Sequence, residues 1–236
     1  MLKPFFTYYG GKYRAAPRYP SPRYTHIVEP FAGSAGYSLR HYTKQVILLD
    51  KDPVIVSLWQ WLIEARSQDF LSLPDIPEGV SVDSFDLRPE AKSLIGFWLN
   101  KGTVSPCKIP SRWMRDGIRP NSFWGPAIRQ RLADQAGAIK HWVALLGDYS
   151  DFPNGAVTWF VDPPYNNEAG RKYRFSNVDY EHLSGWCKER KGQVIVCENS
   201  GATWLPFRDA FSIKSLEGAH GKHKSKEAMW VNDGTP

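Results

Sequence analysis

The feature that most constrains the fold of this 236-residue chain is an alternation of apolar runs and helical patterns near its start. Residues 25–29 read THIVE, and a glycine-containing loop and a helical pattern follow them over 30–42. Residues 45–50 read QVILLD and form the second apolar run. The amphipathic pattern after it has an apolar face made of Ile55, Leu58, Trp59 and Leu62. Strand, helix, strand, helix in this order predicts an α/β fold with a parallel sheet.

This pattern breaks between about residues 75 and 145. Residues 72–90 are rich in Pro, Asp and Ser and are interpreted as a connection, and residues 91–100 as a short helix. Residues 103–126 have no clean period, and a long helix is predicted over about 127–146. The apolar stripe of that helix would consist of Ile128, Leu132, Ala136, Ile139 and Trp142.

Strand patterns return after the interruption, first in VTWFV and QVIVCEN and then in a closing pair, FSIKSLEG and EAMWVND. The chain contains no internal repeat. We therefore predict one sheet domain, formed by residues 1–74 and 146–236, and a mostly helical insertion over 75–145.

Composition limits the possible partners and compartments. The formal net charge of +6 favours an acidic partner such as a nucleic-acid backbone, although a merely basic protein would look the same. Cys107, Cys187 and Cys197 form no C-x-x-C pair, which indicates reduced thiols and a cytoplasmic location. There is no signal-peptide pattern and no run near the roughly 18 apolar residues of a spanning helix, so we expect no membrane association.

Ligands of open parallel sheets bind beyond the carboxyl ends of the strands, and three such ends are distinctive here. The first is EPFAGSAG, which begins at Glu29. Gly33 and Gly36 would let the backbone approach a ligand, and the next helix would offer its N-terminal amides. The spacing departs from G-x-G-x-x-G, so a dinucleotide is not the natural interpretation. An ordinary tight turn between strand and helix is an equal alternative.

The second strand end carries Asp50. A carboxylate there is well placed to accept hydrogen bonds from two ribose hydroxyls. Asp50 or Asp52 could instead cap the next helix, and for this residue alone capping is the favoured interpretation. When Asp50 is considered together with the glycine loop, binding of a ligand that contains adenosine becomes the better interpretation.

The third strand end is Asp162-Pro163-Pro164-Tyr165, directly after VTWFV. Prolines fix the backbone and donate no amide hydrogen, so their carbonyl oxygens are open to donors. Together with the Asp162 carboxylate and the flat face of Tyr165, they suit a planar group that carries an NH2. The alternative is that Pro-Pro ends the strand and Tyr165 packs in the core. Since average Pro usage is about 5%, the tetrapeptide is rare by chance.

These segments together resemble Dam-like DNA adenine methyltransferases. The resemblance rests on DPPY, VEPFAGSAGYSL, the acid in ILLDKDP and the N-terminal FFTYYGGKY, in the order typical of one group of that family. It covers residues 5–61 and roughly 146–233 and is weakest in the insertion. It implies a Rossmann-like methyltransferase sheet with helices on both faces and a helical target-recognition insertion. It also implies methyl transfer from S-adenosylmethionine to the exocyclic N6 amine of adenine in DNA.

The resemblance further implies roles for single residues. Lys12 would pair with the methionine carboxylate of S-adenosylmethionine, Asp50 would hold its ribose, and Asp148 would lie near its adenine. Other expected cofactor contacts are Tyr8, Gly11, Phe31, Gly33, Ser34 and Asp162. The residues expected to hold the target base are Asp162, Pro163, Pro164 and Tyr165. Hydrogen bonds to the Asp162 carboxylate and the Pro163 carbonyl would orient the amine, and Tyr165 would stack on a flipped-out base.

Basic residues gather in three segments that we expect to face double-stranded DNA. They are Lys101, Arg112, Arg115 and Arg119 in the insertion, Arg171, Lys172 and Arg174 after DPPY, and Lys222 and Lys224 before the last strand. Each segment could instead be an ordinary solvated surface. No metal site is expected, because His220 and His223 have no acid or cysteine at ligand spacing. A monomer or weak dimer is expected.

Two other functions are left open. One is a methyltransferase for another planar amine: cytosine, RNA adenine or protein glutamine. By family resemblance Asp162 favours adenine, since Ser would indicate cytosine and Asn glutamine. The other is a catalytically inactive DNA-binding relative, against which intact Lys12, Asp50 and Asp162 argue. A role in a phage, in restriction-modification or in housekeeping is equally open, as is the sequence around the target.

Overall fold

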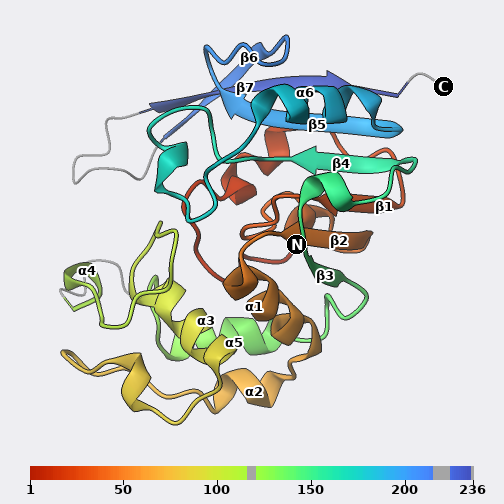
Figure 1. The fold of residues 1–236 in the computed structure, drawn as a ribbon. Coiled ribbons are helices and arrows are strands. Elements are labelled where there is room, and N and C mark those ends of the chain that lie inside the picture. The colour runs from red at the N-terminus through yellow and green to blue at the C-terminus, as the bar shows by residue number, and fades with distance from the viewer. Residues whose placement is uncertain (116–120, 215–223, 235–236) are drawn as a thin grey trace.

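The computed structural model describes residues 1–115, 121–214 and 224–234. Over these residues the protein is an α/β structure, and its seven strands form one mixed sheet in the order β3-β2-β1-β4-β5-β7-β6 (Figure 1). The strands are β1 (His26–Glu29), β2 (Gln45–Asp50), β3 (Val143–Leu146), β4 (Val157–Val161), β5 (Gly192–Asn199), β6 (Arg208–Lys214) and β7 (Lys224–Asn232). Strands β1 to β5 are parallel, and β7 is antiparallel to both β5 and β6. The predicted parallel α/β sheet is confirmed, and two closing strands are present, although residues 215–218 of the predicted FSIKSLEG strand lie outside the described residues.

Helices cover both faces of the sheet. Phe160 of β4 lies in the apolar core that contains Trp59 of α1 (Pro53–Glu64). Its neighbour Trp159 lies in the core that contains Trp186 of α6 (Tyr180–Glu189). Alternate residues of a strand point to opposite faces of a sheet, so α1 and α6 pack on opposite sides. The four residues predicted for the apolar face of α1 are all buried.

The region predicted as the insertion, 75–145, contains helices joined by irregular segments, and it extends the core on the α1 face. Its helices are α3 (Pro89–Leu99), α4 (Arg112–Arg115) and α5 (Pro126–Gln135), and α2 (Ser67–Leu71) precedes it. In Figure 1, α2, α3 and α5 gather beside α1, below β3. Phe97 of α3 and Leu132 of α5 belong to the same apolar core as Trp59. The insertion therefore shares its core with the sheet domain.

The long helix predicted over about 127–146 is wrong in its second half. Helix α5 ends at Gln135, and Val143–Leu146 form β3 beside β2. Gly137 adopts a φ of +84°, a left-handed conformation that a helix does not contain. Ile139 and Trp142 of the predicted stripe are buried, but they lie after the helix has ended.

Two smaller elements also differ from the prediction. The helical pattern after the glycine loop is only the short 3-10 helix Ser38–His41, whose first amide donates to the buried Glu29 carboxylate at 2.8 Å. Helix α6 was not predicted, although Asp179 caps it and its buried residues recur at helical spacing. The other 3-10 helices are Lys12–Arg14, Ala16–Arg18, Val82–Ser84, Tyr149–Asp151 and Gly170–Lys172. Within the described ranges, no helix has the length and apolarity to cross a bilayer.

Candidate functional site

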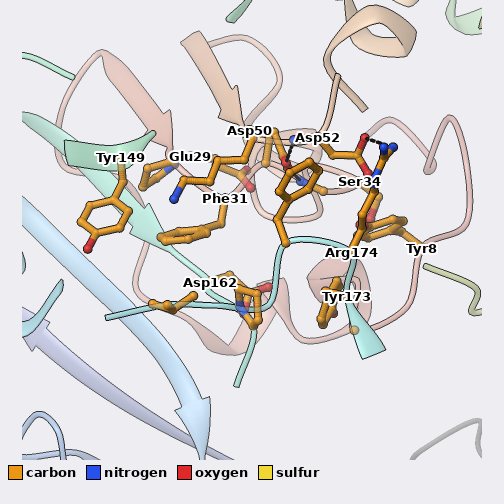
Figure 2. Close-up of a pocket in the computed structure, with 18 of the residues that line it drawn as sticks. Tyr8, Glu29, Phe31, Ser34, Asp50, Asp52, Tyr149, Asp162, Tyr173 and Arg174 are labelled. Carbon is orange, nitrogen blue, oxygen red and sulfur yellow. Dashed lines mark hydrogen bonds and ion pairs between the residues drawn. The ribbon is translucent and has the colours of Figure 1, made fainter. Parts of the chain in front are cut away.

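A cavity of about 530 Å³ opens at the carboxyl ends of the parallel strands. Its wall includes Glu29 at the end of β1, Asp50 at the end of β2, Asp148 just after β3 and Asp162 just after β4. The volume is within the range of roughly 300–1,000 Å³ that small-molecule sites occupy. The structure thus brings the three predicted strand ends into one cavity, and β3 adds a fourth (Figure 2).

The glycine loop and Asp50 form one hydrogen-bonded unit in this wall. Gly33 adopts a φ of +44° and donates its amide to Asp50 Oδ2 at 3.0 Å. Asp50 Oδ1 accepts the amide of Asp52 at 2.9 Å. Burial raises the pKa of Asp50 to about 6, although both amides act against this rise. The carboxylate is therefore fixed in orientation at the cavity wall.

Asp52, not Asp50, caps the following helix. Its carboxylate accepts the amide of Val54 at 2.9 Å, and it is the N-cap residue of α1. The alternative that Asp50 caps α1 is therefore wrong. Asp52 also forms an ion pair with Arg174 at 3.9 Å across the cavity (Figure 2).

The N-terminal Y-x-G-G-K segment packs directly against the glycine loop. A Cβ atom at Gly36 would lie 2.4 Å from the amide nitrogen of Tyr13, so only glycine permits this approach. Gly11 also lies close to Ser34, whose Oγ would be 2.8 Å from a Cβ atom there. The two motifs, which are separated in sequence, therefore form one continuous wall.

Lys12 and Asp162 form a buried ion pair within this wall. The Lys12 ammonium lies 2.8 Å from Asp162 Oδ1 and donates to the carbonyl oxygen of Gly10 at 3.1 Å. Only 7% of the Lys12 side chain and 19% of the Asp162 side chain are exposed. Burial raises the pKa of Asp162 to about 6, and the nearby Lys12 opposes this rise. Burial would lower the pKa of Lys12, but the attraction of Asp162 and Glu227 holds it above its ordinary value.

The residues of DPPY differ in what they contact. Asp162 and Pro164 line the cavity, whereas the wall does not include Pro163, which is buried, or Tyr165. The Pro164 carbonyl oxygen accepts the hydroxyl of Tyr180 at 2.6 Å. The Tyr165 hydroxyl donates to Glu227 Oε2 at 2.5 Å, and the Lys12 ammonium lies 4.6 Å from the centre of the Tyr165 ring. Tyr165 is half-buried.

One end of the cavity is aromatic. The rings of Phe31 and Tyr149 lie 5.4 Å apart and are tilted by 32° (Figure 2). The Tyr149 hydroxyl is 2.8 Å from His182 Nδ1, which joins this end to α6. Two rings in this arrangement are suited to contact a flat ligand.

Asp148 lies at this aromatic end, in the turn after β3. Its carboxylate accepts both the amide and the hydroxyl of Ser150 at 2.9 Å and forms an ion pair with Lys51. Burial would raise the pKa of Asp148, but the bonds from Lys51 and Ser150 hold it below its ordinary value. Asp148 is therefore a charged group with protein partners in the cavity wall.

Tyrosines and Arg174 close the other side of the cavity. Tyr8, which contacts Gly33, lies with its ring centre 5.9 Å from that of Tyr173. The Tyr173 hydroxyl donates to the carbonyl oxygen of Tyr9 at 2.9 Å. The segment after DPPY is thereby attached to the N-terminal motif.

The basic residues predicted to face DNA have different surroundings. Lys101 lies 5.1 Å from the centre of the Phe123 ring, and Arg112 is exposed at the start of α4. Arg115 ends α4 and Lys224 begins β7. In Figure 1, α4 and the segment after β4 lie on the side toward which β4 points. Arg119 and Lys222 lie outside the described residues.

The cluster after DPPY divides between surface and cavity. Arg171 is exposed, and the Lys172 ammonium lies 3.3 Å from the Tyr9 hydroxyl. Arg174 lines the cavity and pairs with Asp52. The structure therefore places Arg174 in the wall of the cavity as well as in the predicted basic cluster.

Several cavity residues were not predicted from the sequence. They are Asp52, Tyr149, Tyr173 and His182 in the wall and Glu227 behind Tyr165. Tyr149 follows Asp148 at the end of a strand, so a correct assignment of β3 would have indicated it. No local pattern indicates Glu227, which reaches DPPY from the antiparallel strand β7.

No protein-family model matches this chain, and no curated protein matches its sequence. In the part of the chain that the structure describes, no group of three His, Cys, Asp or Glu residues is arranged to hold a metal ion. The function must therefore be argued from the cavity itself.

Proposed function

We propose that this protein is an S-adenosylmethionine-dependent methyltransferase that acts on the N6 amine of a flipped-out adenine in DNA. The observation that carries the proposal is the convergence of the glycine loop, Asp50, Lys12 and two residues of DPPY, Asp162 and Pro164, on one cavity. The sheet supports it, because β3-β2-β1-β4-β5 follows the order of the classic dinucleotide-binding sheet. The cavity lies where that order reverses, between β1 and β4, which is the usual ligand position in such sheets.

The donors and acceptors of the cavity fit the cofactor. Phe31 and Tyr149 would contact the adenine ring, and Asp50 would accept from the ribose hydroxyls. A lysine ammonium has three hydrogens. In Lys12, two of them point to the Asp162 carboxylate and the Gly10 carbonyl oxygen. One hydrogen is left for the carboxylate of the methionine part. When bound, the cofactor supplies a methyl group on a positively charged sulfur.

The residues of DPPY would bind and orient the target amine. Asp162 has a pKa of about 6, so it is mostly ionised at neutral pH and accepts one amine hydrogen. The Pro163 carbonyl would accept the other, which fixes the direction of the nitrogen lone pair. Such preorganised acceptors lower the barrier without a covalent intermediate. The ring of Tyr165 would stack on the base, and such stacking contributes about 1–3 kcal/mol per base.

The experiment that tests this proposal is expression in a host that lacks adenine methylation, followed by single-molecule sequencing of its DNA. Modified adenines that appear with the wild-type protein and disappear with Asp162→Asn would support it. Unmodified DNA, together with no binding of S-adenosylhomocysteine in calorimetry, would refute it. Methylated cytosine in the same DNA would point instead to another planar amine.

A further inference from the structure

We propose that Glu227 is a positioning residue that fixes the ring of Tyr165 for the target base. This inference rests on the function proposed above. Glu227 is 5% exposed and lies on β7, opposite Asn199 of β5. Its Oε2 atom accepts the Tyr165 hydroxyl at 2.5 Å and the Tyr19 hydroxyl at 3.3 Å. A carboxylate thus reaches DPPY from a strand that is remote in sequence.

The rest of Tyr165 is already held at its backbone. Its carbonyl oxygen accepts the amide of Asn167 at 2.7 Å. A Cβ atom at Gly170 would lie 1.9 Å from the same oxygen, so the chain folds back onto Tyr165 at a glycine. These contacts fix where the ring begins but leave rotation of the side chain open. The bond to Glu227 fixes the hydroxyl at the outer end of the ring and therefore the direction in which the ring points.

The partners of the neighbouring carboxylates single out this role for Glu227. Asp162 pairs with Lys12. Glu198, which is also buried, accepts the amide of Asn166 at 3.3 Å and the indole of Trp204 at 2.9 Å. Of these three acids, Glu227 is the one whose carboxylate accepts the Tyr165 hydroxyl. Because that hydroxyl is occupied by Glu227, the part of Tyr165 that would serve a target base is its ring and not its donor.

A double-mutant cycle with Tyr165→Phe and Glu227→Gln tests this inference. Tyr165→Phe removes the hydroxyl, and Glu227→Gln keeps the size of the acceptor but removes its charge. Each single change should lower kcat about tenfold or more, as expected for a hydrogen bond to a charged acceptor. The double variant should be no slower than the slower single variant, because both changes remove one interaction. The KM for S-adenosylmethionine should stay within about twofold, since the bond acts on the base.

Tyr19→Phe is the matched control, because it removes the longer bond to the same oxygen. It should change kcat by less than about twofold.

A second measurement places 2-aminopurine at the mapped target adenine. The fluorescence of 2-aminopurine reports stacking in the pocket. Both single variants and the double variant should show the same altered emission.

The outcomes separate this inference from the proposed function. Suppose the wild type methylates DNA. If the fold-reductions in kcat of the two single variants multiply in the double variant, or if Glu227→Gln has full activity, Glu227 does not act through Tyr165. If the wild type transfers no methyl group to DNA, the proposed function fails and the inference falls with it. Circular dichroism confirms that each variant is folded.

Discussion

Replacement of Lys12 by methionine should have an effect on stability that depends strongly on pH. Methionine keeps an apolar stem of similar length but removes the ammonium that lies 2.8 Å from Asp162 Oδ1. Lys12 is buried, so water cannot replace it fully. Removing one partner of a buried pair costs about 3–5 kcal/mol when the other stays charged. Asp162 can avoid part of this cost by taking up a proton.

The direction in which the free energy of unfolding changes with pH follows from the pKa of Asp162. Its value of about 6 in the folded protein is above the ordinary 3.8, so the folded state binds the proton more tightly. Stability is therefore lost as pH rises from about 4 to 6, by about 3 kcal/mol at 1.36 kcal/mol per pH unit. An opposite charge at this distance lowers a carboxyl pKa by roughly 1–3 units. In Lys12→Met the loss should continue to about pH 7–9.

Urea denaturation of both proteins at pH 5, 7 and 9 measures this effect. The destabilisation by Lys12→Met should increase from pH 5 to pH 9 by about 1.4–4 kcal/mol. Asp162→Asn is the matched background, because without the carboxyl the effect of Lys12→Met should no longer vary with pH. A destabilisation that is equal at pH 5 and pH 9 would contradict the role of the ion pair.

The same variant separates the two contacts proposed for Lys12. If Lys12 acts by keeping Asp162 ionised, the kcat of Lys12→Met should fall at pH 7 and recover toward pH 9. If Lys12 binds the carboxylate of S-adenosylmethionine, the KM for the cofactor should rise at every pH. Both effects together are expected, because the ammonium has hydrogens for both partners.

Three further predictions concern the site and its partner. Asp162→Asn should keep the fold and most of the DNA affinity but lower methyl transfer by at least about a hundredfold in a tritium-transfer assay; an active variant would remove Asp162 from the mechanism. Burial raises the pKa of Glu29 to about 8, so the free energy of unfolding should fall between pH 4.5 and 8 by up to about 5 kcal/mol. Glu29→Gln should remove that fall, and an unchanged pH slope in urea denaturation of this variant would argue against the prediction. DNA affinity measured by fluorescence anisotropy should fall steeply between 50 and 200 mM salt, and a flat response would exclude the basic clusters as phosphate contacts.

Much of the cavity could be predicted because its key residues follow apolar runs. A short apolar run that ends in an acid is a local signal, and Asp50 and Asp162 both lie where it places them. Parallel strands then bring their carboxyl ends to one edge of the sheet, so residues far apart in sequence meet. The amphipathic period of α1 was equally local, and its apolar face is buried as predicted.

The parts that could not be predicted depend on tertiary contacts. Strand β3 is an edge strand with Leu146 60% exposed, so its apolar residues continue a helical stripe as readily as they form a strand. Local sequence cannot distinguish the two, and the turn at Gly137 decides between them. Glu227 has no neighbour in sequence that marks it, because its partner Tyr165 lies 62 positions away. Only the antiparallel insertion of β7 beside β5 brings the two together.

The charge of the cavity also bears on what it can bind. The acidic residues in its wall are Glu29, Asp50, Asp52, Asp148, Asp162 and Asp179, and the lysines and arginine are Lys12, Lys51 and Arg174. The three cations pair with Asp162, Asp148 and Asp52. Glu29 and Asp50 instead accept backbone amides, and burial raises the pKa of both. A positively charged ligand would offset the cost of burying these carboxylates in their charged form. The net charge of +6 favours an anionic partner on the surface of the protein. The cationic cofactor in the cavity and the polyanionic DNA at the surface that we propose match these two charge distributions.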